Sequence, residues 1–156
     1  MPSIPDHAET IVRLALPHDL PDVVTMIHAL AAHHGDTALV TLQDLTRDVC
    51  GPQPWMHLLV VARGQALLGY AALIPLAQLQ FGVRGMDMHH LFVRAQDRDK
   101  GCGKMMIQAC IDHAKANGCR YLSVGTAPEN VTAQNIYRAV GFDDSPPPGP
   151  RYRIKW

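Results

Sequence analysis

The chain has 156 residues, of which 47% are apolar and 18% charged, a balance typical of a globular protein with a substantial core. Fourteen basic residues offset fourteen acidic ones, so broad binding to nucleic acid or to anionic membranes has no electrostatic basis. No apolar run approaches the roughly 20 residues of a membrane span, and Met1–His7 lacks the pattern of a signal peptide. We therefore expect a soluble, cytoplasmic protein with no nucleic-acid and no membrane partner.

The first half of the chain is expected to form a strand, two helices and a two-stranded hairpin after a flexible arm over residues 1–9. Asp19 is expected to cap the first helix, and Thr41-x-x-Asp44 resembles a capping box for the second. Alternating or continuous apolar residues separated by a Gly64 turn indicate the hairpin. In chain order these elements are Thr10–Leu16, Leu20–Ala32, 42–49, His57–Ala62 and Ala66–Leu76.

The second half is expected to begin with a loop over Ala77–Arg84 and to alternate strands with helices. The expected elements are a strand over Gly85–Val93, a helix over Gly103–Ala116, a strand over Tyr121–Gly125, a helix over Val131–Val140 and a strand over Arg151–Trp156. The order β-α-α-β-β-β-α-β-α-β predicts a mixed α/β (α+β) domain. We expect a central sheet of six to seven strands with helices on both faces.

A charged loop with two glycines follows the strand that ends at Val93. Gly101 and Gly103 let the backbone approach a ligand, and the free N–H groups of the helix that follows favour an anion. Three basic side chains add positive charge: Arg98, Lys100 and Lys104. The loop therefore suits a phosphate or pyrophosphate, with a charged turn before an ordinary helix as the alternative interpretation.

Two better-known phosphate loops do not fit this stretch. The P-loop needs Gly where this chain has Arg98 and Ser or Thr where it has Met105, and the dinucleotide fingerprint needs a small residue at Met106. The four cysteines have no zinc or redox spacing and are expected to be free thiols: Cys50, Cys102, Cys110 and Cys119. No metal site is expected, and Cys102 has no neighbouring base that would make it a nucleophile.

A second motif, Asn130-x-x-Ala133-x-x-x-Tyr137-x-x-x-Gly141-Phe142, follows about thirty residues later. Asn130 and Tyr137 are separated by about two helical turns and share one helix face. Together with Arg98-x-x-Gly101-x-Gly103 after a Leu-Phe-Val strand, this motif resembles the GNAT superfamily of acetyl-CoA-dependent N-acetyltransferases. The resemblance begins at Thr10 and implies one acetyltransferase domain over residues 10–156.

The resemblance also implies how acetyl-CoA is held. Strand backbone should pair with the pantetheine arm at Leu91, Phe92 and Val93. Loop N–H groups should hold the pyrophosphate at Arg98, Asp99, Lys100, Gly101, Cys102, Gly103 and Lys104. Asn130 should bond the pantetheine, and Tyr137 should protonate the departing thiolate.

Several segments resemble one branch of the superfamily, the diamine (spermidine/spermine) and thialysine acetyltransferases. They are Leu30-Ala31-Ala32-His33-His34-Gly35-Asp36, Leu45-x-x-Asp48-Val49-x-Gly51, Pro54…His57 and the terminal Arg151–Lys155. The branch carries an acidic pair where this chain has His89 and His90. Serotonin-type acetyltransferases, on the same fold, place a histidine two residues before the equivalent of Leu91, which is His89 here.

An amine acceptor must lose a proton before its nitrogen can attack, because an alkyl ammonium with a pKa of about 10.4 is almost fully protonated at pH 7. Histidine can accept that proton at neutral pH. Since adjacent strand residues point to opposite faces, we expect His89 to be the base and His90 to lie behind it. Asp87 and Asp36 are the candidates for holding the amine.

The sequence therefore predicts direct acetyl transfer from acetyl-CoA to a primary amine of a small molecule, through a ternary complex. A homodimer is expected from the resemblance, with the C-terminal strand as a candidate for pairing between subunits. Two alternatives stay open. One is a non-catalytic acyl-CoA-binding or regulatory module, and the other is a protein or peptide acetyltransferase.

Overall fold

The computed structural model describes residues 8–156, so the arm expected over residues 1–9 lies outside the described residues except for its last two. The chain divides into two compact units, the first ending at Gly125 and the second comprising Thr126–Trp156. A single domain over residues 10–156 remains a prediction. Within the described part of the chain, no helix is long and apolar enough to cross a membrane.

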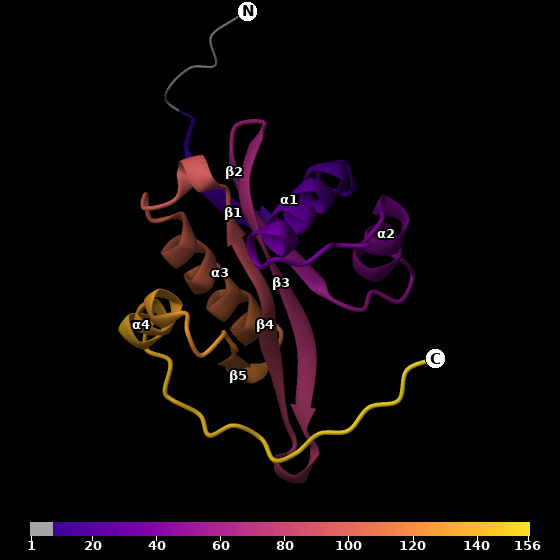
Figure 1. Cartoon of the computed structure of the whole chain (residues 1–156), viewed down its shortest axis with the longest axis vertical. Helices are drawn as coiled ribbons and strands as arrows, with labels where there is room; N and C mark the ends of the chain where they lie inside the picture. Colours follow the sequence, from indigo (N-terminus) through magenta and orange to yellow (C-terminus); the bar gives the residue numbers. More distant parts are fainter. Residues whose placement is uncertain (1–7) are drawn as a thin grey trace, which may run out of the picture. The chain divides into compact units, whose positions relative to one another are not determined.

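The first unit is a mixed five-stranded sheet with helices on both faces (Figure 1). The strands lie in the order β1-β2-β3-β4-β5, with antiparallel pairing from β1 to β4 and parallel pairing between β4 and β5. The elements are β1 (Thr10–Leu14), α1 (Leu20–His33), α2 (Leu42–Cys50), β2 (His57–Arg63), β3 (Ala66–Gln78), β4 (Val83–Val93), α3 (Cys102–Ala116) and β5 (Cys119–Ser123). The predicted mixed sheet is confirmed.

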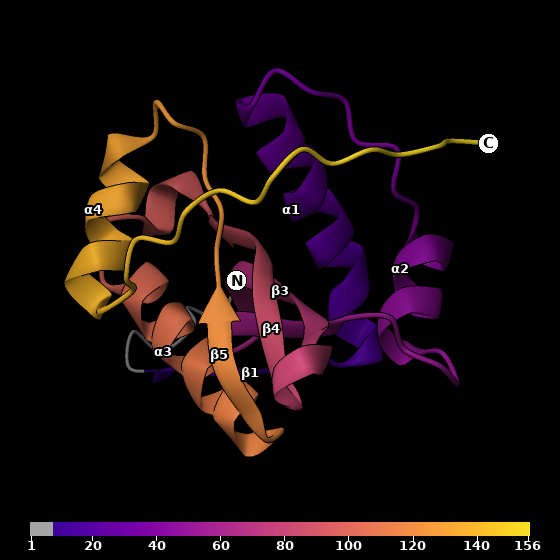
Figure 2. The ribbon, with the colours of Figure 1, turned by 90° about the horizontal axis from the view of Figure 1, so that it is seen from below.

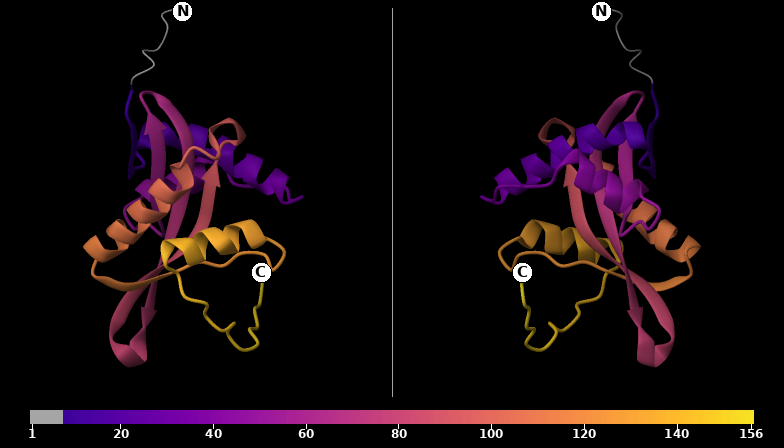
Figure 3. Two further views of the ribbon diagram at one scale, coloured as in Figure 1. Left: turned by 90° about the vertical axis from the view of Figure 1, so that its left-hand side faces the viewer. Right: turned by 90° about the vertical axis from the view of Figure 1, so that its right-hand side faces the viewer.

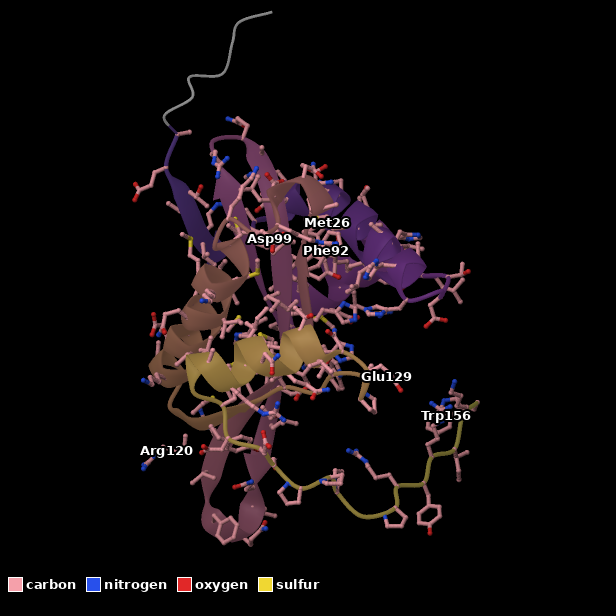
Figure 4. All side chains as sticks on the ribbon, turned by 60° about the vertical axis from the view of Figure 1, so that its left-hand side comes forward. Met26, Phe92, Asp99, Arg120, Glu129 and Trp156 are labelled. Carbon is pink, nitrogen blue, oxygen red and sulfur yellow. The ribbon has the colours of Figure 1, made fainter. Side chains whose placement is uncertain are left out.

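Two layers of core lie on opposite faces of the sheet, with α1 and α2 on one side and α3 on the other (Figure 2). Met26 of α1 packs in one buried cluster with Phe92 of β4, and the two are labelled in Figure 4. On α3, the buried residues are Cys102, Met106, Ile107, Cys110 and Ala114. Because β2 is covered on both faces, its residues Leu58–Ala62 are all buried, as a continuous apolar run predicts.

The hairpin between β3 and β4 is longer than the sequence predicts. The expected loop over Ala77–Arg84 is reduced to a 3-10 turn at Leu79–Phe81, because Ala77 pairs with Arg84 and Gln78 with Val83. From Ile74 onward β3 has no partner on β2, so the hairpin projects from the body of the sheet (Figure 3). Pairing with β4 extends β3 beyond the predicted end at Leu76 to Ala77 and Gln78, which are exposed and carry no alternating apolar pattern.

Asp19 does not cap α1 as expected, but fixes the connection between β1 and α1. Its carboxylate accepts hydrogen bonds from Arg13 at 2.6 and 3.1 Å and from the backbone N–H of Leu16 at 2.7 Å. These bonds lower the pKa of Asp19, the Arg13 guanidinium having the largest effect, and the side chain is only 4% exposed. The strand expected to reach Leu16 ends at Leu14, where this connection begins.

The second unit contains one helix, α4 (Val131–Val140), followed by an extended tail. Asn130 caps α4 and Gly141 ends it in the left-handed conformation, as the motif predicts. The strand expected over Arg151–Trp156 is wrong, since these residues are irregular. Alternation alone does not make a strand without a paired neighbour. Residues 8–156 therefore give five strands, not six to seven, and the element order ends at α4.

Candidate active site

Strand β4 has a free edge over its second half. Parallel β5 pairs with β4 only from Arg84 to Asp87 and then ends at Ser123. From Met88 to Val93, β4 therefore has no strand partner on this side among the described residues. Its unpaired N–H and C=O groups can bond an extended ligand as another strand would. The residues predicted to hold pantetheine, Leu91, Phe92 and Val93, lie in this stretch.

The glycine loop leads into α3 with the geometry of an anion site. Asp99 and Gly101 both have positive φ, 61° and 86°, and Gly101 is the N-cap. The first helical hydrogen bond runs from the Met105 N–H to the Gly101 carbonyl at 3.1 Å. Three N–H groups of the first turn, at Cys102, Gly103 and Lys104, thus have no intrahelical acceptor. Together with the helix dipole they favour a bound anion.

Two of the loop cations shape the loop itself. Arg98 Nε donates to the Val93 carbonyl and Lys100 Nζ donates to the Gln96 carbonyl, both at 2.9 Å. Cys102 is 3% exposed and faces the core, so only its backbone is available to a ligand. A Cβ at Gly103 would meet no atom within 4 Å, and its φ is not positive. The protein itself does not require glycine there, which fits space reserved for a phosphate.

A β-bulge in β4 places both adjacent histidines on one side of the sheet. Ala72 pairs with His90 and Leu73 pairs with Met88, so His89 is an extra residue without a partner on β3. The bulge breaks the alternation, and the two imidazole rings stack with centroids 4.6 Å apart and 12° between their planes. The two rings therefore lie on the same side of the strand, contrary to the expectation that these adjacent residues point to opposite faces.

His90 contacts a buried tyrosine of β3, whereas His89 is exposed. The hydroxyl of buried Tyr70 lies 3.0 Å from His90 Nδ1. Burial lowers the pKa of His90, and the charges of His89 and of His34, at the end of α1, lower it further. The described residues contain no group of three metal-ligating side chains placed to hold an ion.

The two candidate carboxylates differ in their surroundings. Asp87 is half-buried on β4, and its Oδ1 accepts a hydrogen bond from the Ser123 hydroxyl at 2.8 Å. Counted along β4, it is two residues from His89 and shares its face. Asp36 is exposed in the connection after α1, where its N–H donates to the Ala31 carbonyl.

The second unit carries the other two predicted site residues. Asn130 Oδ1 accepts the N–H of Ala133 at 3.1 Å, which leaves its amide N–H groups to bond a ligand. The Tyr137 ring packs edge-to-face against Phe142, with 5.6 Å between centroids. Partial burial raises the pKa of Tyr137, so its hydroxyl stays protonated at neutral pH.

Two features of the site, Tyr70 beside His90 and the bulge in β4, were not predicted from the sequence. Tyr70 gives no local signal, because only the pairing of β3 with β4 brings it to His90. The bulge does leave a trace. Met86 and Met88 on β4 are buried but are not members of the cluster in which Phe92 packs with Met26 of α1, although all three β4 residues are even-numbered. A parity change between two apolar sets in one strand is the signature of an inserted residue.

His57, part of the resemblance to the diamine branch, lies on the opposite face of the sheet. Its Nδ1 is 2.7 Å from Nε2 of His113 on α3. Burial and the charge of His57 lower the pKa of His113. This pair ties α3 to β2 and is separate from the histidines on the bulge.

Comparison with known proteins agrees with this geometry. The model of the Acetyltransferase (GNAT) family matches residues 26–142. A mouse (Mus musculus) thialysine N-epsilon-acetyltransferase is 26% identical over 147 residues, covering 88% of this chain and 86% of that protein. A Pseudomonas paraeruginosa L-methionine sulfoximine/L-methionine sulfone acetyltransferase is 32% identical over 79 residues, covering 51% and 45%.

The fold is shared with solved structures at lower identity. An aminoglycoside N-acetyltransferase, AAC(6')-Iy, solved in complex with CoA, superposes with a TM-score of 0.75 at 18% identity, covering 97% of this chain and 99% of that one. The family match spans more than half of the chain and includes β4, the glycine loop and α4. This chain therefore belongs to the Acetyltransferase (GNAT) family and is an acetyl-CoA-dependent acetyltransferase.

Proposed function

We propose that the protein transfers the acetyl group of acetyl-CoA directly to a primary amine of a small molecule, in a ternary complex. The observation that carries this proposal is the free edge of β4, with the glycine loop after one end and the stacked histidines at the other. A pantetheine arm that leaves the pyrophosphate at the loop and follows Val93 back to Leu91 brings its thioester toward the bulge. Each residue of β4 corresponds to about 3.3 Å of length along the pantetheine arm.

The residues of the site fit acetyl-CoA by their chemistry. The loop offers N–H groups for the pyrophosphate, and the open space at Gly103 leaves room for it. The edge of β4 offers alternating donors and acceptors for the amides of pantetheine. Asn130, in the second unit, has free amide N–H groups that suit the carbonyls of pantetheine by their chemistry. Acetyl-CoA, when bound, supplies the activated acetyl group as a thioester.

The proposed chemistry needs one base and one acid. His89 takes a proton from the acceptor ammonium, and the freed nitrogen lone pair forms a bond to the thioester carbonyl carbon. The carbon–sulfur bond then breaks, and the sulfur takes the proton of the Tyr137 hydroxyl. The nitrogen releases its second proton through solvent, which leaves a neutral amide and restores the Tyr137 hydroxyl. No covalent acetyl-enzyme is required, since buried Cys102 faces away from the loop surface.

The proposed acceptor is a compact amine, in line with relatives whose names specify thialysine and L-methionine sulfoximine. Asp87 lies on the same strand as the proposed base and is half-buried, so it is the better placed of the two carboxylates to hold a second polar group of the acceptor. Exposed Asp36 would attract cationic acceptors at longer range. With two histidines where the diamine branch has acids, a polycation is a poorer fit than an amino-acid-like amine.

The test is thiol release from acetyl-CoA against spermidine, thialysine, lysine, aryl-alkyl amines and an amino sugar. We expect the protein to acetylate one of these classes of amine and not the others. Tyr137→Phe should reduce kcat by roughly 10²-fold or more while leaving the affinity for acetyl-CoA nearly unchanged, since it removes only the proton donor. Tyr152→Phe, in the exposed tail, is the matched control.

Two results would contradict the proposal. Tight acetyl-CoA binding without thiol release on the whole panel would favour a binding module or a macromolecular acceptor. Full activity of Tyr137→Phe would remove the assigned acid.

A further inference from the structure

We propose that Tyr70 is a positioning residue that holds His90 as the neutral tautomer with its proton on Nε2, which leaves His89 as the only proton acceptor of the stacked pair. This inference rests on the proposed function, because it assigns the base within that site. Tyr70 lies on β3 and is not among the residues predicted to bind acetyl-CoA or the amine. Its effect on the reaction therefore passes through His90.

The hydrogen bond has only one reasonable direction. Tyr70 is fully buried, and its hydroxyl hydrogen needs an acceptor. Within residues 8–156, this hydroxyl lies 3.0 Å from Nδ1 of His90. If Nδ1 carried a proton and donated to Tyr70, the buried hydroxyl hydrogen would have no acceptor there. Nδ1 therefore accepts, and a neutral imidazole with an acceptor at Nδ1 carries its proton on Nε2.

The surroundings of His90 keep this state neutral. The groups that face it are Tyr70 from β3, His89 from its own strand and His34 from the end of α1. Burial lowers the pKa of His90 first, and the two histidine charges add to that effect. Burial also raises the pKa of Tyr70, so the hydroxyl keeps the proton that it donates. A proton on Nδ1 of His90 would point at the hydroxyl hydrogen of Tyr70 and would break the hydrogen bond between them.

This arrangement divides the work of the two rings. His90 presents an N–H at Nε2 and no free lone pair, so it acts as a donor throughout the reaction. His89 is exposed and stacked on a neutral neighbour, so it can accept the ammonium proton without facing a second positive charge in ring contact. The bulge makes this division possible because it puts both rings on one side.

The first test needs neither substrate nor turnover. Nitrogen-15 NMR of the imidazoles at pH 7.5 should show His90 with a protonated Nε2 and an unprotonated Nδ1. In Tyr70→Phe, His90 should become a mixture of tautomers and its pKa should rise, whereas Tyr121→Phe should leave the His90 signals as in the parent. A proton on Nδ1 of His90 in the parent would overturn the inference, even if Tyr70→Phe does not fold.

The second test separates the two rings by activity. Glutamine keeps an N–H donor near the position of Nε2 but cannot accept a proton, so His90→Gln should retain turnover within about tenfold. His89→Gln should lose roughly 10²-fold or more in kcat/KM. In Tyr70→Phe, His90 should take up a proton at a higher pH than in the parent, and a protonated His90 opposes proton transfer to His89. The acidic midpoint of the kcat/KM profile should therefore move to higher pH.

The outcomes also distinguish this inference from the function on which it rests. Parent protein without turnover on any amine would refute the proposed function, while the NMR result would still decide the tautomer. An active parent in which His90→Gln is as impaired as His89→Gln would overturn the division of roles and leave the acetyltransferase proposal intact.

Discussion

Gly101 and Gly103 are two residues apart, but they differ in whether the backbone conformation requires glycine. Gly101 has a φ of 86°, where a side chain is strained, so it shapes the turn into α3. Gly103 has no positive φ, and a Cβ there would meet no atom within 4 Å, so the fold does not require glycine at this position. A substitution at Gly103 can therefore test the proposed ligand binding separately from folding.

Gly103→Val should therefore fold normally and bind acetyl-CoA poorly. A Cβ at this position meets no protein atom within 4 Å, so we expect the melting temperature to stay near that of the parent. It occupies the space proposed for the pyrophosphate, and we expect the Kd for acetyl-CoA to rise at least tenfold, or about 1.4 kcal/mol. Calorimetric titration measures this, with Gly149→Val in the proline-rich segment as the control. An unchanged Kd would exclude the loop as the phosphate site.

Elements in this fold depend on a few polar contacts at their ends. Between β1 and α1, Asp19 joins Arg13 and the Leu16 N–H in one part-buried contact. Asp19→Asn removes the charge that pairs with the partly exposed Arg13 guanidinium, and we expect a loss of about 2 kcal/mol in the free energy of unfolding at pH 7. Urea unfolding measures it. Asp144→Asn, which breaks the exposed pair with Arg138, should have little effect.

The same pair makes stability depend on pH. Because the pKa of Asp19 is lower in the folded chain than the roughly 3.9 of an unfolded one, its contribution is complete above that value. It disappears as the pH falls through the folded pKa. The difference between the parent and Asp19→Asn should thus shrink toward pH 2, and a difference that is constant from pH 7 to pH 2 would contradict this account.

Periodicity and capping signals predicted the helices and most strands, because those patterns report burial on one or two faces. They failed where structure depends on pairing instead. The extension of β3 to Gln78 has no apolar signature, and the tail after Gly149 alternates without a partner. For the site, His89, His90 and the loop could be named from the motif. Tyr70 and the bulge could not, since both depend on the register between distant strands.

At the scale of the whole molecule, the exposed tail bears on the expected homodimer. Tyr152, Ile154 and Trp156 are almost fully exposed and alternate with three basic residues. If this segment pairs with a second copy, deletion of residues 151–156 should convert a dimer into a monomer in light scattering. Replacing the three basic residues by glutamine should preserve the dimer. A monomeric parent, or a truncated chain that remains dimeric, would rule out this role.

The bulge at His89 has a consequence for how copies of the chain meet in solution. A straight strand with an open edge is a template for pairing with the same edge of another molecule, which leads to aggregation. An inserted residue twists the strand and interrupts the regular spacing of its donors and acceptors. The inserted residue, His89, thus also protects the open edge of β4 from pairing with another copy of the chain.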